Sequence, residues 1–161
     1  MSADVRPTGP NAWKDSHARV LDRYVAGALR AHVRVLYVED DEVSVRLVAT
    51  VLRRRGDCEL FSARTGQAGL RLAEAERPDL VMLDLDLPDM PGETVLRRLR
   101  EASLGARVLV VVVSADARAA TAATVLAASA SYVLTKPLDL AELDWWLDTA
   151  EATVSGRSEV S

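Results

Sequence analysis

The stretch PDLVMLDLDLPDMPG, residues 78–92, contains the pattern that decides the fold. Its short apolar run, Leu80–Leu83, ends at the acidic residue Asp84. Three other apolar runs also end at polar residues: Val33–Val38 before Glu39 and Asp40, Val108–Val113 before Ser114, and Tyr132–Thr135 before Lys136 and Pro137. The carboxyl ends of parallel strands share one edge of a sheet, and ligands bind in the crevice there. The polar residues are therefore predicted to meet at one site.

Strand-length and helix-length segments alternate along the chain. Five strands are predicted, at those four runs and at Cys58–Ala63. Helices are predicted where apolar residues recur at helical spacing: Glu42–Arg55, Gly66–Arg77, Glu93–Ala102, Ala117–Ala128 and Leu140–Thr153. Five βα units in series predict an α/β fold, a doubly wound parallel five-stranded sheet with right-handed crossovers and helices on both faces.

Length and composition are typical of one domain with short extensions, since the chain has 161 residues and 49% of them are apolar. Residues 33–153 are predicted to form this domain, residues 1–10 to be disordered and residues 154–161 to be a short polar tail. Residues 11–32 are predicted to form an N-terminal helix with an apolar stripe. That stripe could dock on its own domain, pair with its twin in a dimer, or continue an upstream helix of a larger ancestor.

Charge and cysteine content exclude several classes of function. Residues 1–32 carry five Lys/Arg against three Asp/Glu, whereas residues 33–161 carry fifteen against twenty-one. An acidic main domain disfavours a direct nucleic-acid role. No run approaches membrane-spanning length, no signal peptide is recognisable, and the single Cys58 cannot form an internal disulfide. A cytoplasmic location is therefore expected.

The four polar positions suit phosphoryl transfer to a carboxylate. Asp84 could attack a phosphoryl group, but both partners are anionic, so positive charge must be supplied. Mg²⁺ prefers oxygen ligands, and Glu39 and Asp40 provide carboxylates for it. The ammonium of Lys136 could neutralise one phosphoryl oxygen, and the hydroxyl of Ser114 could donate to another.

Four segments together resemble the signature of the response-regulator receiver domain: LYVEDDE at 36–42, PDLVMLDLDLPDMPG at 78–92, VSA at 113–115 and LTKP at 134–137. The intervals between them agree with the family, with 44 residues from Asp40 to Asp84, 30 from Asp84 to Ser114 and 22 from Ser114 to Lys136. The resemblance covers roughly residues 33–152. It implies a flavodoxin-like strand order of 2-1-3-4-5.

The resemblance also implies a role for each residue of the site. Asp84 would be the phosphoacceptor, and Glu39, Asp40, Asp84 and the backbone carbonyl of Asp86 would hold Mg²⁺. Ser114 would be the switch hydroxyl, with room left by Ala115, and Lys136 would bridge to the phosphoryl group and precede a cis proline. The phosphoryl group would come from a histidine of a partner kinase or phosphotransfer protein. The domain would catalyse its own modification without being a turnover enzyme.

Output would pass to a downstream protein target. The face formed by the family's fourth helix, fifth strand and fifth helix is its usual output surface, and a homodimer could form there or through the N-terminal helix. Two departures from the family pattern affect this switch. Val133 occupies the usual aromatic position, and Tyr132, one residue earlier, should point to the opposite face of the sheet. Asp86 and Asp116 place acidic side chains beside the site and are expected to alter the acyl phosphate lifetime, with the sign left open.

Other residues have simpler interpretations. Asp41 and Glu42 are expected to cap the following helix, and Arg53–Arg55 to complement the dipole at its end. Adjacent Trp145 and Trp146 are expected to be one buried and one partly exposed.

Two rival functions also remain. One is a haloacid-dehalogenase phosphatase, because Asp84-Leu85-Asp86 resembles its Asp-x-Asp motif, although the order of the acidic pair along the chain argues against it. The other is a receiver-like scaffold that binds partners without phosphorylation.

Overall fold

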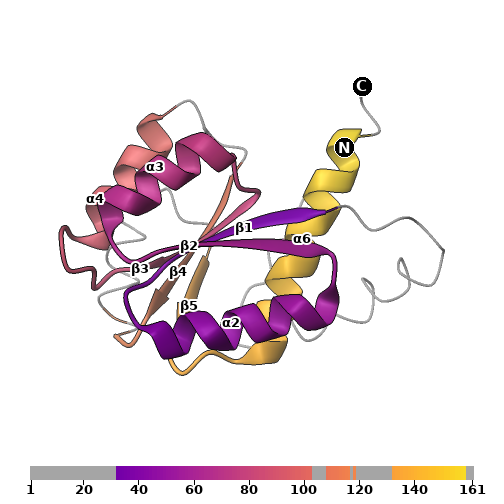
Figure 1. Cartoon of the computed structure of the whole chain (residues 1–161), viewed down its shortest axis with the longest axis horizontal. Coiled ribbons are helices and arrows are strands. Elements are labelled where there is room, and N and C mark those ends of the chain that lie inside the picture. Colours follow the sequence, from indigo (N-terminus) through magenta and orange to yellow (C-terminus); the bar gives the residue numbers. More distant parts are fainter. Residues whose placement is uncertain (1–31, 103–107, 117, 119–131, 159–161) are drawn as a thin grey trace.

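The computed structural model describes residues 32–102, 108–116, 118 and 132–158 of the protein (Figure 1). Five strands form one parallel sheet: β1 (Val33–Val38), β2 (Cys58–Ala63), β3 (Leu80–Asp84), β4 (Leu109–Ser114) and β5 (Tyr132–Thr135). Four helices lie in the described part of the chain: α2 (Glu42–Arg55), α3 (Gly66–Glu76), α4 (Gly92–Glu101) and α6 (Leu140–Ser158). The strand order is β2-β1-β3-β4-β5, which confirms the predicted doubly wound, flavodoxin-like sheet.

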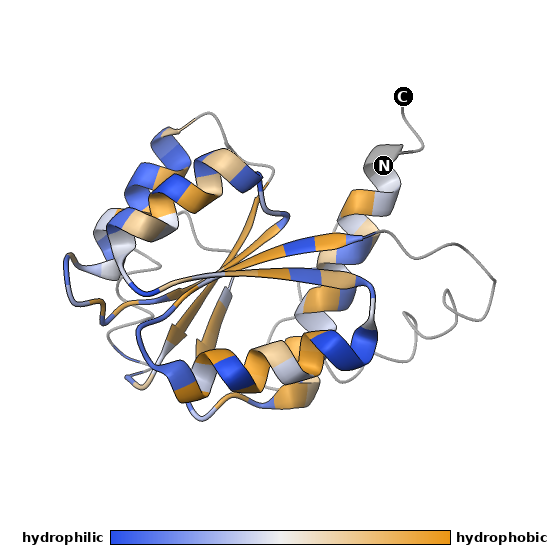
Figure 2. Cartoon of the chain, viewed as in Figure 1, coloured by the Kyte–Doolittle hydropathy of each residue, from blue (hydrophilic) through white to orange (hydrophobic). Residues whose placement is uncertain are grey.

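Helices cover both faces of the sheet, with α2 and α6 on one face and α3 and α4 on the other (Figure 1). Each face has its own apolar core. Val111 and Val113 of β4 belong to the core under α2 and α6, whereas Val110 and Val112 belong to the core under α3 and α4. Figure 2 shows strands that are mainly hydrophobic between helices that mix hydrophilic and hydrophobic residues. This layering accounts for the continuous valine run of a strand buried on both faces.

The element boundaries differ slightly from the predicted ones. Asp84 and Ser114 are the last residues of β3 and β4 rather than the first residues after them, because the β-ladder continues to the sheet edge. Helix α3 ends one residue early, at Glu76, and Arg77 adopts a left-handed conformation with φ of 50°. The following Pro78 disfavours the helical conformation at that position. Helix α6 continues to Ser158, through most of the predicted tail.

The predicted cap of α2 is confirmed at Asp41, and Glu42 is the acidic residue of the first turn. The carboxylate of Asp41 accepts the backbone N–H of Ser44 at 3.0 Å, and Gly56 ends the helix with φ of 73°. The predicted N-terminal helix and the predicted helix over residues 117–128 lie outside the described residues, apart from residues 32 and 118. No helix in the described ranges combines the length and the apolarity that crossing a membrane requires.

The prediction for the two tryptophans is wrong, because Trp145 and Trp146 are both buried, at 7% and 6% exposure. The ring of Trp146 packs against Tyr132 of β5 with 5.3 Å between centroids. The ring of Trp145 stacks edge-on against Trp146 at 4.6 Å. Aromatic rings favour this T-shaped arrangement, so adjacent side chains on a helix reach sideways into one cluster.

Arg55 has a larger role than complementing the dipole of α2. Its side chain is only 12% exposed and forms ion pairs with Asp57 at 3.3 Å and, on α6, with Asp148 at 2.7 Å, Asp144 at 3.3 Å and Glu151 at 3.5 Å. The side chains of Asp57, Asp148 and Glu151 are themselves nearly buried. One guanidinium therefore joins the end of α2 to α6.

Arg55→Met is expected to destabilise the domain by about 3 kcal/mol, because removing one partner of a buried ion-pair network leaves uncompensated carboxylates. Urea unfolding followed by circular dichroism measures this change. Arg53→Met is the matched control, since Arg53 is exposed at the end of the same helix. Equal unfolding midpoints for the two variants would contradict a structural role for the Arg55 network.

Candidate functional site

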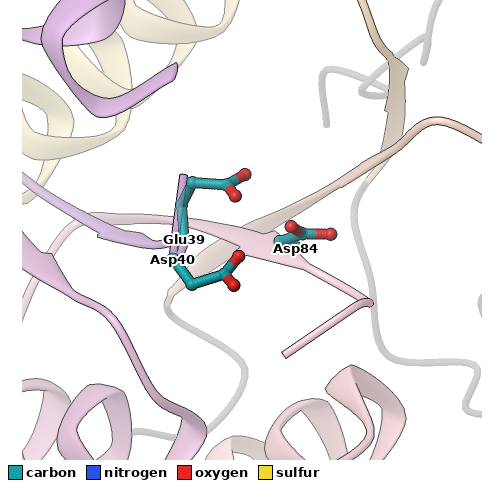
Figure 3. A group of neighbouring side chains, drawn as sticks. All are labelled: Glu39, Asp40 and Asp84. Carbon is teal, nitrogen blue, oxygen red and sulfur yellow. The ribbon is translucent and has the colours of Figure 1, made fainter. Parts of the chain in front are cut away.

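Three carboxylates gather at the carboxyl edge of the sheet (Figure 3). Glu39 and Asp40 follow β1, and Asp84 ends the adjacent strand β3. Each contributes a carboxylate oxygen to a group whose members all lie within 4.8 Å of one another. Glu39 and Asp84 are buried, at 1% and 4% exposure, whereas Asp40 is exposed. The site thus has a buried floor and one side open to solvent.

Lys136 supplies the positive charge next to this group. It follows β5, and its ammonium donates to Glu39 at 2.7 Å and to Asp84 at 3.1 Å. Burial opposes its charged form, but the hydrogen bonds to both carboxylates outweigh burial and raise the pKa of Lys136. The Lys136–Pro137 peptide bond is cis, as the family resemblance implied.

Glu39 is held by three donors. One carboxylate oxygen accepts the Lys136 ammonium and, at 3.1 Å, the hydroxyl of Tyr37, while the other accepts the backbone N–H of Asp41 at 3.0 Å. Burial raises the pKa of the Glu39 carboxyl, and the Lys136 and Asp41 hydrogen bonds oppose that shift. Sequence reasoning missed Tyr37, although residues two apart on a strand point to the same face. A tyrosine two residues before the acidic residue that follows a predicted strand was the available signal.

Ser114 lies at the end of β4, buried at 2% exposure, but its hydroxyl is engaged locally. It donates to the backbone carbonyl of Asp116 at 3.2 Å and accepts the N–H of the same residue at 3.1 Å. Its backbone carbonyl accepts the N–H of Lys136 at 2.9 Å. The structure thus brings Glu39, Asp40, Asp84 and Lys136 together. Ser114 ends β4, which lies between β3 and β5, and its hydroxyl is turned toward Asp116 in the loop that follows.

Asp86 lies in the loop after β3, where its backbone N–H donates to the Asp84 carboxylate at 3.0 Å. Beside this loop is a cleft of about 610 Å³, lined by residues 85–91, Glu93, Ser114 and Asp116. Asp86 and Asp116 are both exposed and both line it. The cleft therefore places two predicted flanking carboxylates beside the strand ends that carry the site.

Tyr132 and Val133, where the sequence departs from the family pattern, lie on opposite faces of the sheet, as predicted. Tyr132 packs against the core under α2 and α6, and Val133 against the core under α3 and α4. Burial raises the pKa of the Tyr132 hydroxyl. The Tyr132 ring packs against Trp146. This aromatic side chain therefore belongs to the core under α2 and α6, whereas the usual switch position, Val133, belongs to the other core.

The donor set fits a hard divalent cation. Three carboxylates face one ammonium, which leaves excess negative charge in a partly buried pocket, and oxygen atoms are the ligands that Mg²⁺ prefers. The same pocket has one ammonium that could also contact an anion. The arrangement can therefore hold a cation and a phosphoryl group side by side.

This fold and this charge arrangement define a class, the flavodoxin-like domains with an acidic site at the carboxyl edge of the sheet. The family model for the response regulator receiver domain matches residues 35–147. The chain belongs to this family, whose members serve two-component systems and are regulatory domains rather than turnover enzymes. The family assignment favours a receiver over the haloacid-dehalogenase alternative.

The curated relatives include transcriptional regulators. The KDP operon transcriptional regulatory protein KdpE of Escherichia coli is 39% identical over 109 residues, which cover 68% of this chain and 47% of the relative. The probable transcriptional regulatory protein TcrX of Mycobacterium tuberculosis is 37% identical over 111 residues, covering 69% of this chain and 46% of the relative. The chain thus spans about half the length of these relatives.

Solved structures include close neighbours in fold. The receiver domain of the sensor histidine kinase PA1611 from Pseudomonas aeruginosa has a TM-score of 0.68 and 29% identity, covers 76% of this chain and 99% of its own, and holds a magnesium ion in its active-site cleft. A response regulator from Chloroflexus aurantiacus has a TM-score of 0.67 and 27% identity, and the match covers 74% of this chain and 98% of that one.

Proposed function

We propose that this domain is a phosphoacceptor in a two-component or phosphorelay system. Asp84 accepts a phosphoryl group from a histidine of a partner kinase or phosphotransfer protein in an Mg²⁺-dependent reaction, and the modification switches a protein-interaction surface. One observation carries the proposal: the Asp84 carboxylate lies within 4.8 Å of those of Glu39 and Asp40 and accepts the Lys136 ammonium at 3.1 Å.

Glu39, Asp40, Asp84 and the Asp86 carbonyl would hold the metal ion. When bound, Mg²⁺ supplies the positive charge that lowers repulsion between a carboxylate and an incoming phosphoryl group. The magnesium ion of the Pseudomonas aeruginosa receiver domain supports this assignment. The remaining steps depend on residues of the chain itself.

Asp84 acts as the nucleophile, one carboxylate oxygen forming the new P–O bond while the P–N bond to the donor histidine breaks and the imidazole recovers a proton from solvent. The N–H of Asp86 orients the Asp84 carboxylate through its 3.0 Å hydrogen bond. Lys136 neutralises charge on the phosphoryl group. Ser114 gives up its bonds to Asp116 and turns its hydroxyl toward the phosphoryl oxygens.

The signal leaves through a change in the loops after β4 and β5. Lys136 and Ser114 are joined by the hydrogen bond between the Lys136 N–H and the Ser114 carbonyl, so a backbone shift that accompanies the turn of the Ser114 hydroxyl would reach both segments. With Val133 at the usual aromatic position, this backbone connection replaces the aromatic switch. The output is contact with a downstream protein target. A homodimer could form through the face of the family's fourth helix, fifth strand and fifth helix, or through residues 11–32.

Incubating the protein with Mg²⁺ and acetyl phosphate, followed by intact-mass measurement, tests the proposal. The expected result is one phosphoryl group per chain. Adding EDTA before the donor should prevent this modification. A scaffold would remain unmodified even with the donor in excess. A phosphatase would hydrolyse many equivalents of donor without accumulating the modified chain.

The two carboxylates on the cleft are expected to shorten the acyl phosphate lifetime. Both carry negative charge near the modified residue, and both can accept a proton from an attacking water molecule. Replacing Asp86 and Asp116 together with Asn should lengthen the half-life of the acyl phosphate by roughly threefold, as expected for exposed charges. Mass spectrometry after donor removal gives the rate. Glu74→Gln with Glu101→Gln removes two exposed charges from α3 and α4 and should leave the rate unchanged.

A further inference from the structure

The loop of residues 85–92 carries the Asp86 carbonyl and is closed on itself. The N–H of Gly92 donates to the carbonyl of Leu85 at 3.0 Å, and Asp86 and Pro91 form an isolated antiparallel bridge. These contacts fix the shape of the loop. The start of the loop is held to β3 by the hydrogen bond from the Asp86 N–H to the Asp84 carboxylate, and β3 pairs with β1, whose end carries Glu39 and Asp40. The position of the rest of the loop depends on contacts with other elements.

Asp89 connects this loop to another element. Its two carboxylate oxygens accept the backbone N–H groups of Gly66 at 2.7 Å and Gln67 at 2.9 Å, the first two residues of α3. These hydrogen bonds, of which the one from Gln67 has the larger effect, hold the pKa of Asp89 below its usual value. The carboxylate is therefore ionised at neutral pH, and a negative charge at a helix N-terminus is favourable.

Helix α3 is itself seated on the strand that carries the acidic pair. Gly69 lies so close to Val38, the residue before Glu39, that a Cβ at position 69 would meet the valine side chain at 2.7 Å. At the start of the helix, a Cβ at Gly66 would meet the Met90 side chain of the loop at 2.6 Å. Glycine at both positions allows these close approaches without displacing the neighbouring side chains. The first turns of α3 therefore touch both segments of the proposed metal site.

We propose that Asp89 is a positioning residue, which holds the Asp86 carbonyl in register with Glu39 and Asp40 by attaching the 85–92 loop to the first turn of α3. This role rests on the proposed function, because it concerns the assembly of that same metal site. Asp89 need not touch the metal or the phosphoryl group. Its effect passes through Gly66 and Gln67 to α3, and from Gly69 of α3 to the end of β1.

A purely structural role would also follow from the same hydrogen bonds, since Asp89 caps α3. The chain offers a control that separates the two. Thr65 is the N-cap residue of the same helix, and its hydroxyl accepts the N–H of Ala68 at 3.1 Å. It is not part of the loop of residues 85–92. Thr65→Ala removes a cap from α3, and Asp89→Ala removes a cap together with the attachment of the loop.

The test compares Asp89→Ala and Thr65→Ala with the wild type in Mg²⁺ titrations followed by amide chemical shifts. We expect Asp89→Ala to weaken Mg²⁺ binding by about tenfold, the lower end for outer partners of metal ligands. Thr65→Ala should leave the affinity within about twofold. Asp89→Asn keeps one acceptor oxygen and should lie between the wild type and Asp89→Ala. Hydrogen exchange at Gly66 and Gln67 should become faster in Asp89→Ala, which confirms that the attachment is lost.

Three results would overturn the inference, and they differ in what else they affect. If Asp89→Ala exposes the amides of Gly66 and Gln67 but binds Mg²⁺ like the wild type, the positioning role alone is wrong. If Thr65→Ala weakens binding as much as Asp89→Ala, the effect is a loss of helix stability. If the wild type binds no Mg²⁺ at all, the proposed function fails and the role of Asp89 fails with it.

Discussion

Asp84→Asn is expected to abolish formation of the acyl phosphate. The amide lacks the negative oxygen that attacks phosphorus, and it also removes one of the three carboxylates that would hold Mg²⁺. The fold should survive, because Lys136 keeps its 2.7 Å contact with Glu39 and an amide oxygen can still accept the N–H of Asp86. Intact-mass measurement after incubation with acetyl phosphate and Mg²⁺ should show no modified chain, a loss larger than that from any other single change at the site.

The matched control is Asp79→Asn, the same substitution near the start of β3. The carboxylate of Asp79 accepts the backbone N–H of Arg34 at 2.9 Å, at the opposite edge of the sheet from the site. This variant should be modified at the wild-type rate. Undiminished modification of Asp84→Asn, with the phosphoryl group found on another residue, would contradict the assignment of Asp84 as phosphoacceptor.

Gly92→Ala is expected to have the largest effect among substitutions outside the charged residues. A Cβ at this position would lie 2.5 Å from the Cα of Leu85 and 2.7 Å from the carbonyl oxygen of Asp84. Both are backbone atoms, so they cannot move aside as a flexible side chain would. We expect a loss of about 3 kcal/mol in the free energy of unfolding, the upper part of the range for overpacking.

Displacement of this backbone would also displace the proposed phosphoacceptor, Asp84. Leu85 follows Asp84 directly and its carbonyl accepts the Gly92 N–H, so the variant should take up less phosphoryl group even at low temperature, where it remains folded. Gly156→Ala is the control, because nothing lies within 4 Å of a Cβ there and alanine favours a helix. A Gly92→Ala variant as stable and as rapidly modified as the wild type would show that the close approach is not required.

The sheet could be predicted almost completely from the sequence. Strands buried on both faces leave unmistakable apolar runs, and the polar residues at their ends identify the carboxyl edge. The same alternation predicted correctly that Tyr132 and Val133 lie on opposite faces. Errors of one residue at Asp84, Ser114 and Arg77 arose because ladder hydrogen bonds and a following proline, rather than composition, decide where an element ends.

The members of the site were also predicted, but their contacts were not. The sequence identifies Glu39, Asp40, Asp84 and Lys136 through their positions after strands. It does not show that Tyr37 donates to Glu39, or that the Ser114 hydroxyl turns to Asp116. Such hydrogen bonds depend on side-chain rotamers and on which neighbouring donor is nearest, and residue spacing carries no information about either.

The sequence by itself determined the alternation of strands and helices, the parallel direction of the strands and the identity of the charged residues at one edge, because each follows from a periodicity of two or 3.6 residues and from strand direction. Only the tertiary structure decided that Arg55 pairs with Asp148 and Glu151, that both tryptophans are buried, and that Asp89 reaches the first turn of α3. Each of these outcomes depends on residues that are distant in the chain and that three-dimensional packing brings together, which a local pattern does not record.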